Sequence, residues 1–285
     1  MPAATATATG QLTSFYGEMT SLDRVRRSLE REGVDVEHLQ ARDLYERDLD
    51  CQNLGGFGML EVIATAVAER AVPQPEDHVL DVGCGMGGPG RFLTDRFGCS
   101  VTGIDLLPLR VESAEDLTKR TGLAERIVYR VASVTDLPFE VGAFAQVWML
   151  DVGIHVRDKA AMFAEIARVL RPGGLFVMHD QMGPLAKAMA PATRHAPFVA
   201  PSLPQLIRYA EAAGLRLMTW QDSTARIVDY FQQIRARLGP PDAQREHEAR
   251  SWRTWIRITA DAYLATLDKL GGRTGIVLAE RQPTP

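Results

Sequence analysis

The chain has 285 residues, of which 46% are hydrophobic and 24% carry a charge. These fractions are ordinary for a globular protein, so enough apolar side chains are available for a core of normal size. The formal net charge is −4 and no basic block occurs, which argues against a nucleic-acid partner. The three cysteines form no CxxC pair, so we expect a reducing compartment and a cytoplasmic protein.

The first ten residues are mostly alternating alanine and threonine, with neither a basic region nor a long apolar run. We expect residues 1–10 to be a disordered tail rather than a targeting signal. Elsewhere no apolar run approaches the roughly 20 residues that a membrane-spanning helix needs. The sequence therefore predicts no membrane span.

Residues 11–72 are expected to form an N-terminal helical arm and cap. Ser21 has the side chain of a helix N-cap, and the helix that follows would run towards Glu32 and end at Gly33. A second helix is predicted over residues 58–71, because its apolar positions recur with helical spacing. Two prolines end this helix before the next segment.

From Val79 onward, apolar strand-like runs alternate with helical segments of 10–15 residues. This alternation predicts an α/β fold with a parallel sheet and helices on both faces. We expect residues 73–182 to form the cofactor-binding core. The predicted strands are Val79–Val82, Ser100–Asp105, Ile127–Ala132, Ala145–Leu150 and Leu175–His179. The predicted helices between them lie near residues 88–96, 109–121 and 159–170, the last one stopped by Arg171-Pro172-Gly173-Gly174.

The C-terminal third contains a loop rich in proline and alanine over residues 183–205. A loop of this length in a compact domain suggests a lid over a substrate. We expect residues 183–270 to form this lid and a cap that includes a sixth strand. Residues 271–285 would add the last strand of the core. The elements predicted here are a helix to about residue 213, strand Leu215–Gln221, helices 224–238 and 242–269, and strand Thr274–Glu280.

The residues from Val79 to Gly88, with the sequence Val-Leu-Asp-Val-Gly-Cys-Gly-Met-Gly-Gly, predict a strand, a glycine turn and the start of a helix. This layout lets backbone N–H groups approach an adenosine-type cofactor closely. Asp105 ends the next strand, where a carboxylate can accept hydrogen bonds from the two hydroxyl groups of a ribose. Asp81 would repel a pyrophosphate but attract an ammonium group, so it favours a cofactor with a positive charge over a dinucleotide.

The pattern Asp-Val-Gly-Cys-Gly-x-Gly resembles motif I of the class I S-adenosylmethionine (SAM) methyltransferases. The segment from Glu165 to Gly174 resembles the fold signature of that family. The resemblance implies a Rossmann-like, seven-stranded, mostly parallel sheet whose last strand is antiparallel, with a helical cap. It implies SAM as cofactor and S-adenosylhomocysteine as product. The residues expected around the cofactor are Tyr16, Gln52, Asn53, Asp81, Gly83, Gly85, Asp105, Leu106, Ala132, Ser133, Val134 and Leu150.

Ser133 stands where the family usually has an aspartate, which puts the expected carboxylate contact to the adenine amino group in doubt, although a hydroxyl can also accept a hydrogen bond. Tyr16 resembles the N-terminal tyrosine that closes over the methionyl end of SAM in this family. The alternative is that Tyr16 is a surface aromatic on a mobile arm.

Asp151 and His155 follow the fourth predicted strand and are the candidate catalytic residues. They are four residues apart, so on a helical turn they would share a face. Asp151 could orient an amine, take a proton or stabilise a cation, and His155 could be a base or a hydrogen-bond donor. Alternatively, Asp151 caps the following turn and His155 is a packed histidine. The segment resembles the same region of sarcosine- and dimethylglycine-type N-methyltransferases and of prenyl C-methyltransferases.

The resemblance implies methyl transfer from SAM to a small-molecule secondary metabolite. Our first hypothesis is C-methylation of a prenyl or terpenoid double bond, of the teleocidin or geranyl diphosphate type, which can trigger cyclisation. The alternatives are N-methylation of a small amine, metal-dependent O-methylation through Asp151, Asp180 and Gln181, and SAM binding without catalysis. We expect no resident metal. The expected partners are a small apolar or cationic substrate and further copies of the chain, docked through the N-terminal arm.

Overall fold

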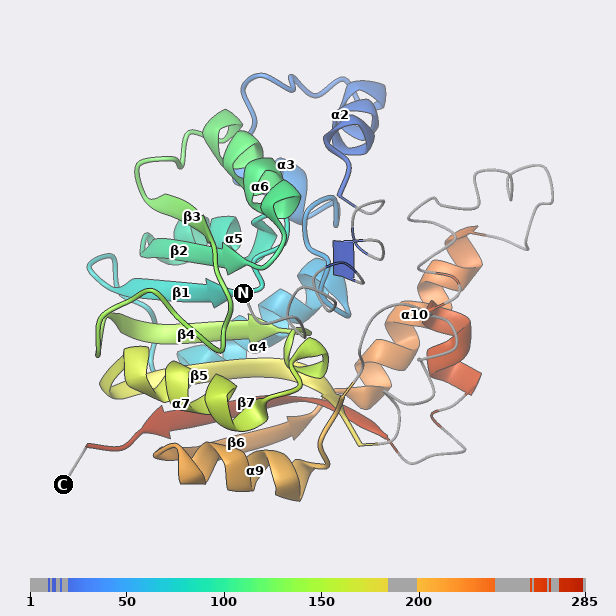
Figure 1. Cartoon of the computed structure of the whole chain (residues 1–285). Helices are drawn as coiled ribbons and strands as arrows, with labels where there is room; N and C mark the ends of the chain where they lie inside the picture. The colour runs from blue at the N-terminus through green and yellow to red at the C-terminus, as the bar shows by residue number, and fades with distance from the viewer. Residues whose placement is uncertain are drawn as a thin grey trace.

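A seven-stranded sheet runs through the chain in the order β3-β2-β1-β4-β5-β7-β6 (Figure 1). The computed structural model describes residues 10, 12, 13, 16, 20–183, 199–238, 257, 259–265, 267 and 272–283. The strands are β1 His78–Val82, β2 Ser100–Asp105, β3 Ile127–Val131, β4 Phe144–Leu150, β5 Leu170–Met182, β6 Leu215–Asp222 and β7 Arg273–Arg281. The helices are α2 Leu22–Arg31, α3 Ala41–Tyr45, α4 Gly56–Ala68, α5 Gly88–Phe97, α6 Pro108–Arg120, the short turn η1 Gly153–His155, α7 Lys159–Val169, α9 Leu203–Ala212 and α10 Thr224–Leu238.

The first five strands are parallel, and β7 is antiparallel to both of its neighbours, β5 and β6. The predicted α/β class, with a mostly parallel sheet and an antiparallel last strand, is therefore confirmed. Neighbours β1 and β4 separate the two halves of the sheet, because the chain builds outward from β1 to β3 and then from β4 to β5. Such a reversal leaves a crevice at the carboxyl ends of the two central strands.

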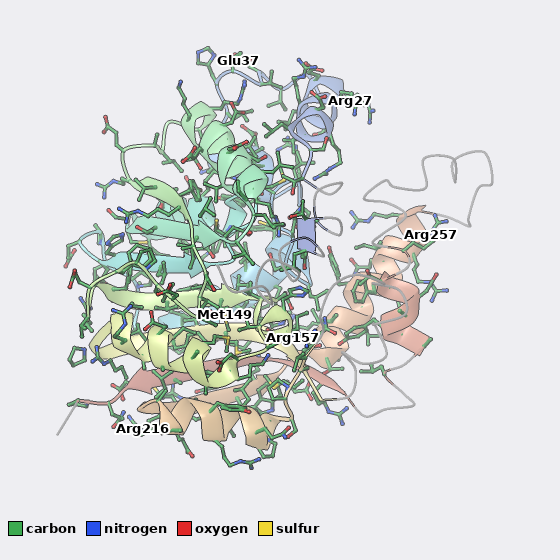
Figure 2. The ribbon with its side chains drawn as sticks, in the orientation of Figure 1. Arg27, Glu37, Met149, Arg157, Arg216 and Arg257 are labelled. Atoms are coloured by element: carbon green, nitrogen blue, oxygen red, sulfur yellow. The ribbon has the colours of Figure 1, made fainter. Side chains whose placement is uncertain are left out.

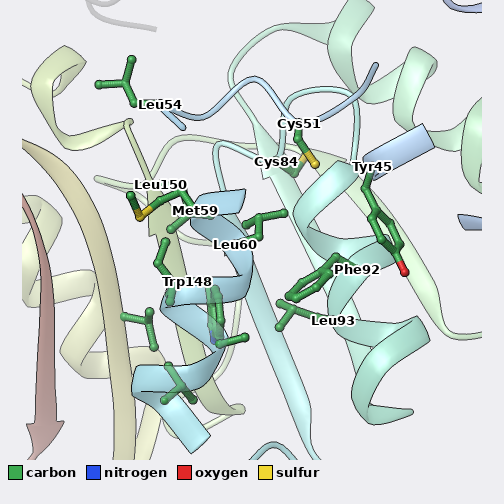
Figure 3. Packing of buried hydrophobic residues seen from close by; sticks show 14 of the residues in the cluster. Tyr45, Cys51, Leu54, Met59, Leu60, Cys84, Phe92, Leu93, Trp148 and Leu150 are labelled. Atoms are coloured by element: carbon green, nitrogen blue, oxygen red, sulfur yellow. The ribbon is translucent and has the colours of Figure 1, made fainter. Parts of the chain in front are cut away.

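Apolar side chains of the sheet alternate between two cores. Val79 and Trp148 pack with α4, α5, α6 and α10 on one face, whereas Leu80, Val147 and Met149 pack with α7 and α9 on the other. This alternation follows from the two-residue period of a strand. Figure 3 shows the first core, where Met59 and Leu60 of α4 face Trp148 and Leu150 of β4. The two layers of helices hold the strands rigid and leave their carboxyl ends as the place for a site.

Some predicted boundaries were wrong. The Arg-Pro-Gly-Gly segment ends α7 at Val169 as expected, but β5 already begins at Leu170, which pairs with Phe144 before an irregularity in the ladder. Helix α3 was not predicted, because five residues are too few for a periodic pattern. The remaining shifts are small: β3 ends one residue early and α4 covers Gly56–Ala68 instead of 58–71.

Other predictions lie outside the described residues. These are the tail over residues 1–9, most of the loop at 184–198 and much of the helix predicted over 242–269. Within that last range, residues 257, 259–265 and 267 are described, and all of them are helical. The division of the chain into tail, arm, core, lid and last strand stays a prediction. Among the described helices, none is long and apolar enough to cross a membrane.

A buried ion pair ties the N-terminal segment to the core. Arg91 of α5 donates from Nη2 and Nε to Asp50 Oδ2, at 2.6 and 3.1 Å, and both side chains are fully buried. The same guanidinium donates to the hydroxyl of Thr118 at 2.7 Å and to the carbonyl oxygen of Ala114 at 3.2 Å. Arg91 therefore fixes α5, α6 and the segment before α4 relative to one another.

We predict that Arg91→Met lowers the free energy of unfolding by about 3–5 kcal/mol, because it leaves the Asp50 carboxylate buried and without its counter-ion. The control is Arg96→Met on the same helix, which removes an exposed pair with Glu61 and should cost about 1 kcal/mol or less. Urea unfolding measures both. Equal losses in the two variants would contradict the account.

Candidate functional site

A cavity of about 400 Å³ opens at the carboxyl ends of β1, β2 and β4. It lies at the crevice between β1 and β4 that the strand order creates. Every residue that the sequence predicts to bind the cofactor or to take part in catalysis lines this one cavity. These residues are Tyr16, Gln52, Asn53, Asp81, Gly83, Gly85, Asp105, Leu106, Ala132, Ser133, Val134, Leu150, Asp151 and His155. The structure thus brings them together, whereas their individual roles stay predictions.

The glycine turn after β1 has a backbone that side chains would disturb. Gly83 and Gly85 have φ values of 70° and 55°, in the left-handed region that glycine adopts most readily. A Cβ on Gly83 would lie 2.3 Å from a methyl group of Val152. The turn is therefore a close-packed wall of the cavity that exposes backbone rather than side chains.

The carboxylate of Asp105 holds the two loops that flank the cavity. Its Oδ2 accepts from the backbone N–H of Gly85 at 3.1 Å, and its Oδ1 accepts from that of Leu107 at 3.0 Å. Arg110 lies 3.8 Å away and lines the cavity as well. Each carboxylate oxygen can accept more than one hydrogen bond, so Asp105 can still receive two hydroxyl groups.

Asp81 is 1% exposed, and its Oδ2 has no hydrogen-bond partner among the described residues. Burial raises the pKa of Asp81 to about 7, and the nearby charge of Asp105 adds to the shift. The backbone N–H of Gly90, in the first turn of α5, acts in the opposite direction. A buried acceptor oxygen of this kind, beside a cavity, is suited to a ligand with a positive charge.

The segment after β3 forms another wall. Ala132, Ser133 and Val134 all line the cavity. The hydroxyl of Ser133 is engaged in its own turn, because it lies 2.8 Å from the hydroxyl of Thr135 and accepts from the Thr135 N–H at 3.3 Å. Ser133 therefore stabilises the turn in addition to any contact with a ligand.

Tyr16 lies against the end of the cavity formed by η1. Its hydroxyl is 2.7 Å from Nε2 of His155, and its ring packs over the guanidinium of Arg110, with 4.5 Å between Cζ and the ring centroid. Burial is the main reason that the pKa of Tyr16 is raised, so the phenol stays protonated at neutral pH. The contact joins a residue of the N-terminal arm to the predicted catalytic histidine.

Asp151 follows β4 in a left-handed conformation, with φ 57°. Its Oδ2 accepts from the backbone N–H of Leu54 at 2.7 Å and lies 3.4 Å from Nδ1 of His179. Its Oδ1 is buried and has no partner in the described part of the chain. The side chain does not cap η1, whose N-cap is Val152. A strained backbone held by several contacts, with one acceptor oxygen left over, is typical of a functional residue.

Asp180 and Gln181, which the metal hypothesis joins to Asp151, do not point the same way. Successive residues of a strand face opposite sides, and only Gln181 lines the cavity. Asp180 accepts from the N–H of Ile154 at 3.2 Å, and burial, together with the charge of Asp151, raises its pKa well above the usual value. In the ranges that the structure describes, no three His, Cys, Asp or Glu residues are grouped so that they could hold a metal.

Several residues of the site were missed from the sequence. Arg110 could have been found, because it lies in the first turn of the helix that follows Asp105. Asp50 and Thr259 also line the cavity, but they come from distant segments and no local pattern marks them. The contact of His179 with Asp151 spans 28 residues and depends on the pairing of β4 with β5.

Comparisons with known proteins agree with this geometry. Residues 80–178 match the family described as "Methyltransferase domain". The tocopherol O-methyltransferase of Arabidopsis thaliana is 42% identical over 100 residues, which cover 35% of this chain and 29% of that protein. The sarcosine/dimethylglycine N-methyltransferase of Halorhodospira halochloris is 35% identical over 108 residues, which cover 38% of this chain and 39% of that protein.

Among solved structures, a geranyl diphosphate methyltransferase in complex with SAM superposes with a TM-score of 0.66 at 24% identity. The match covers 79% of this chain and 84% of that one. At this identity the likeness shows the shared fold. The sequence matches span well under half the length of the two curated relatives.

We predict that Asp81 makes the stability of the ligand-free protein depend on pH. Its folded-state pKa, about 7, lies above the ordinary value of 3.8, so folding favours the protonated carboxyl and stability falls as the pH rises through 7. Between pH 5.5 and pH 8, the free energy of unfolding of the wild type should fall by on the order of 2 kcal/mol relative to that of Asp81→Asn. Urea unfolding at both pH values measures the difference, and a constant difference would contradict the shift.

Proposed function

We propose that this chain, whose residues 80–178 match the family described as "Methyltransferase domain", is a class I SAM-dependent methyltransferase that transfers a methyl group from SAM to a small molecule in the same cavity. Bound SAM would supply an electrophilic methyl group on a sulfonium. The observation that carries the proposal is the single cavity at the crevice between β1 and β4, with acidic residues at the ends of both β1 and β2 and a further carboxylate after β4.

The polar and apolar groups in the cofactor part of the cavity fit those of SAM. The buried Oδ2 of Asp81 lacks a partner among the described residues and would receive the ammonium group. Asp105 would accept the ribose hydroxyls, and the segment from Ala132 to Val134 would hold the adenine. Leu106 and Leu150 would supply apolar contacts, and Gln52 and Asn53 amide contacts without charge. Tyr16 would close the methionyl end.

The substrate part of the cavity presents acceptor oxygens from three separate elements. Asp151 Oδ1, Gln181 Oε1 and Thr259 Oγ1 are buried and have no hydrogen-bond partner in the described part of the chain, and all three residues line the cavity. The same cavity is also lined by the apolar residues Leu12, Leu54, Val152 and Ile154. A carboxylate in apolar surroundings stabilises a positive charge strongly. The site therefore suits a substrate that gains a positive charge during methylation.

C-methylation of a prenyl or terpenoid double bond meets this requirement best. Methylating an alkene leaves a carbocation, which Asp151 can stabilise and the ring of Tyr230 can shield. The site offers few positive charges for a diphosphate headgroup. The described cavity lining contains two arginines, and one of them, Arg110, already contacts Tyr16 and Asp105. The other, Arg157, lies beyond the carboxyl end of the strand that contains Met149 (Figure 2).

N-methylation of a small amine is the second candidate. Asp151 Oδ1 would pair with the ammonium form of the substrate. The hydroxyl of Tyr16, which contacts Nε2 of His155, would offer a route for the proton that the amine loses. NMR spectroscopy of the product separates a new C–CH₃ from a new N–CH₃ group. Transfer of label from radioactive SAM to a metabolite extract distinguishes both from a SAM-binding protein without catalysis.

We predict that Asp105→Ala weakens SAM binding by about 100-fold or more, because the variant loses charge-assisted hydrogen bonds to the ribose. Isothermal titration calorimetry measures the affinity, and a thermal scan confirms that the variant is folded. Asp116→Ala, on the exposed side of α6, is the matched control and should bind like the wild type. Undiminished affinity for SAM in Asp105→Ala would contradict the proposal that Asp105 binds the ribose.

We also predict that Asp151→Asn lowers turnover about 100-fold while the affinity for SAM stays within twofold. The variant keeps the shape of the side chain but loses the charge that stabilises the transition state. Steady-state transfer of label from SAM measures the effect. Asp158→Asn is the control, because Asp158 also lines the cavity but caps α7, a role that asparagine fulfils. Unchanged turnover in Asp151→Asn would exclude the proposed role.

A further inference from the structure

We propose that His179 is a positioning residue that, together with Ser223, fixes the charge and direction of the Asp151 carboxylate; this inference rests on the proposed function. His179 lies in β5 and Ser223 just before α10. Neither residue lines the cavity, and their exposed fractions are 0% and 1%. They would act through Asp151 and not on the substrate itself.

The three side chains form a continuous line. Nδ1 of His179 lies 3.4 Å from Asp151 Oδ2, and Nε2 of His179 lies 3.0 Å from the hydroxyl oxygen of Ser223. Ser223 is itself held by a hydrogen bond from its N–H to the carbonyl oxygen of Thr274, at 2.9 Å. The line therefore runs from the end of the cavity into the buried join between β7 and α10.

If His179 is neutral and Asp151 is ionised, the chemistry of the groups fixes the direction of the hydrogen bonds. A neutral imidazole has one N–H, and an ionised carboxylate can only accept. The proton of His179 must then sit on Nδ1 and point at Asp151, and Nε2 must accept from the Ser223 hydroxyl. The order of groups is that of a serine–histidine–aspartate triad, but here the serine is buried and the carboxylate meets the cavity. The arrangement therefore orients the carboxylate of Asp151 and does not activate the serine as a nucleophile.

This arrangement explains which oxygen of Asp151 is left for the substrate. The N–H of Asp151 donates to the carbonyl oxygen of His179 at 2.7 Å, so one residue holds both the backbone and the side chain of Asp151. Oδ2 is occupied by the Leu54 N–H and faces His179. Oδ1 is left as the acceptor. The left-handed backbone of Asp151, with φ 57°, is kept in place by these contacts.

The first test does not need the substrate. In protein labelled with ¹⁵N, the ring nitrogen shifts of His179 at neutral pH should show the neutral tautomer with the proton on Nδ1, and Ser223→Ala should change the Nε2 shift. A neutral tautomer with the proton on Nε2 in the wild type would overturn the proposal. A failure of the proposed function, seen as no methyl transfer by the wild type, would leave this measurement intact.

The second test uses turnover. In His179→Asn the amide nitrogen can occupy the place of Nδ1, because both atoms are bonded to Cγ, whereas His179→Leu offers no donor. We expect His179→Leu to lower kcat about 10- to 100-fold with the affinity for SAM unchanged, and His179→Asn to recover most of that loss. In the Asp151→Asn background, His179→Leu should have little further effect. Wild-type turnover in His179→Leu, equal losses in the Leu and Asn variants, or additive losses with Asp151→Asn would contradict the role.

Discussion

The hydrogen bond from the Leu54 N–H to Asp151 Oδ2, at 2.7 Å, joins the segment before α4 to the end of β4. The two residues are 97 positions apart, and the bond closes one wall of the cavity over the crevice of the sheet. The buried pair of Asp50 and Arg91 fixes the same segment to α5 a few residues earlier. These two contacts therefore fix the segment that forms one wall of the cavity.

The enclosure has electrostatic consequences. Carboxylates gather at the ends of β1, β2 and β4, where little water screens them, so each raises the cost of ionising its neighbours. The raised pKa values of Asp81 and Asp180 follow from this burial and from the charges of Asp105 and Asp151. A cationic cofactor would relieve this repulsion. Because the carboxylates are already buried in the folded protein, binding the cofactor does not have to remove them from water.

The local parts of this architecture could be predicted from the sequence, and the long-range parts could not. The strand from Ser100 to Asp105 was predicted to the residue. Its start is marked by Gly98, the C-cap of α5 two residues earlier. The candidate residues from Asp81 onward meet in one cavity because parallel strands bring their carboxyl ends together. In contrast, the left-handed backbone of Asp151 and its contacts with Leu54 and His179 depend on the folded neighbours. The opposed directions of Asp180 and Gln181 could have been anticipated from the strand period alone.

We propose that the crevice between β1 and β4 holds the methyl donor with its reactive end towards Asp151. A crystal structure of the protein with S-adenosylhomocysteine tests it most directly. The account predicts the ribose hydroxyls at Asp105, the adenine beside Ala132 and Val134, and the sulfur facing the end of β4. Density for the ligand in the opposite orientation, or outside this cavity, would contradict the account.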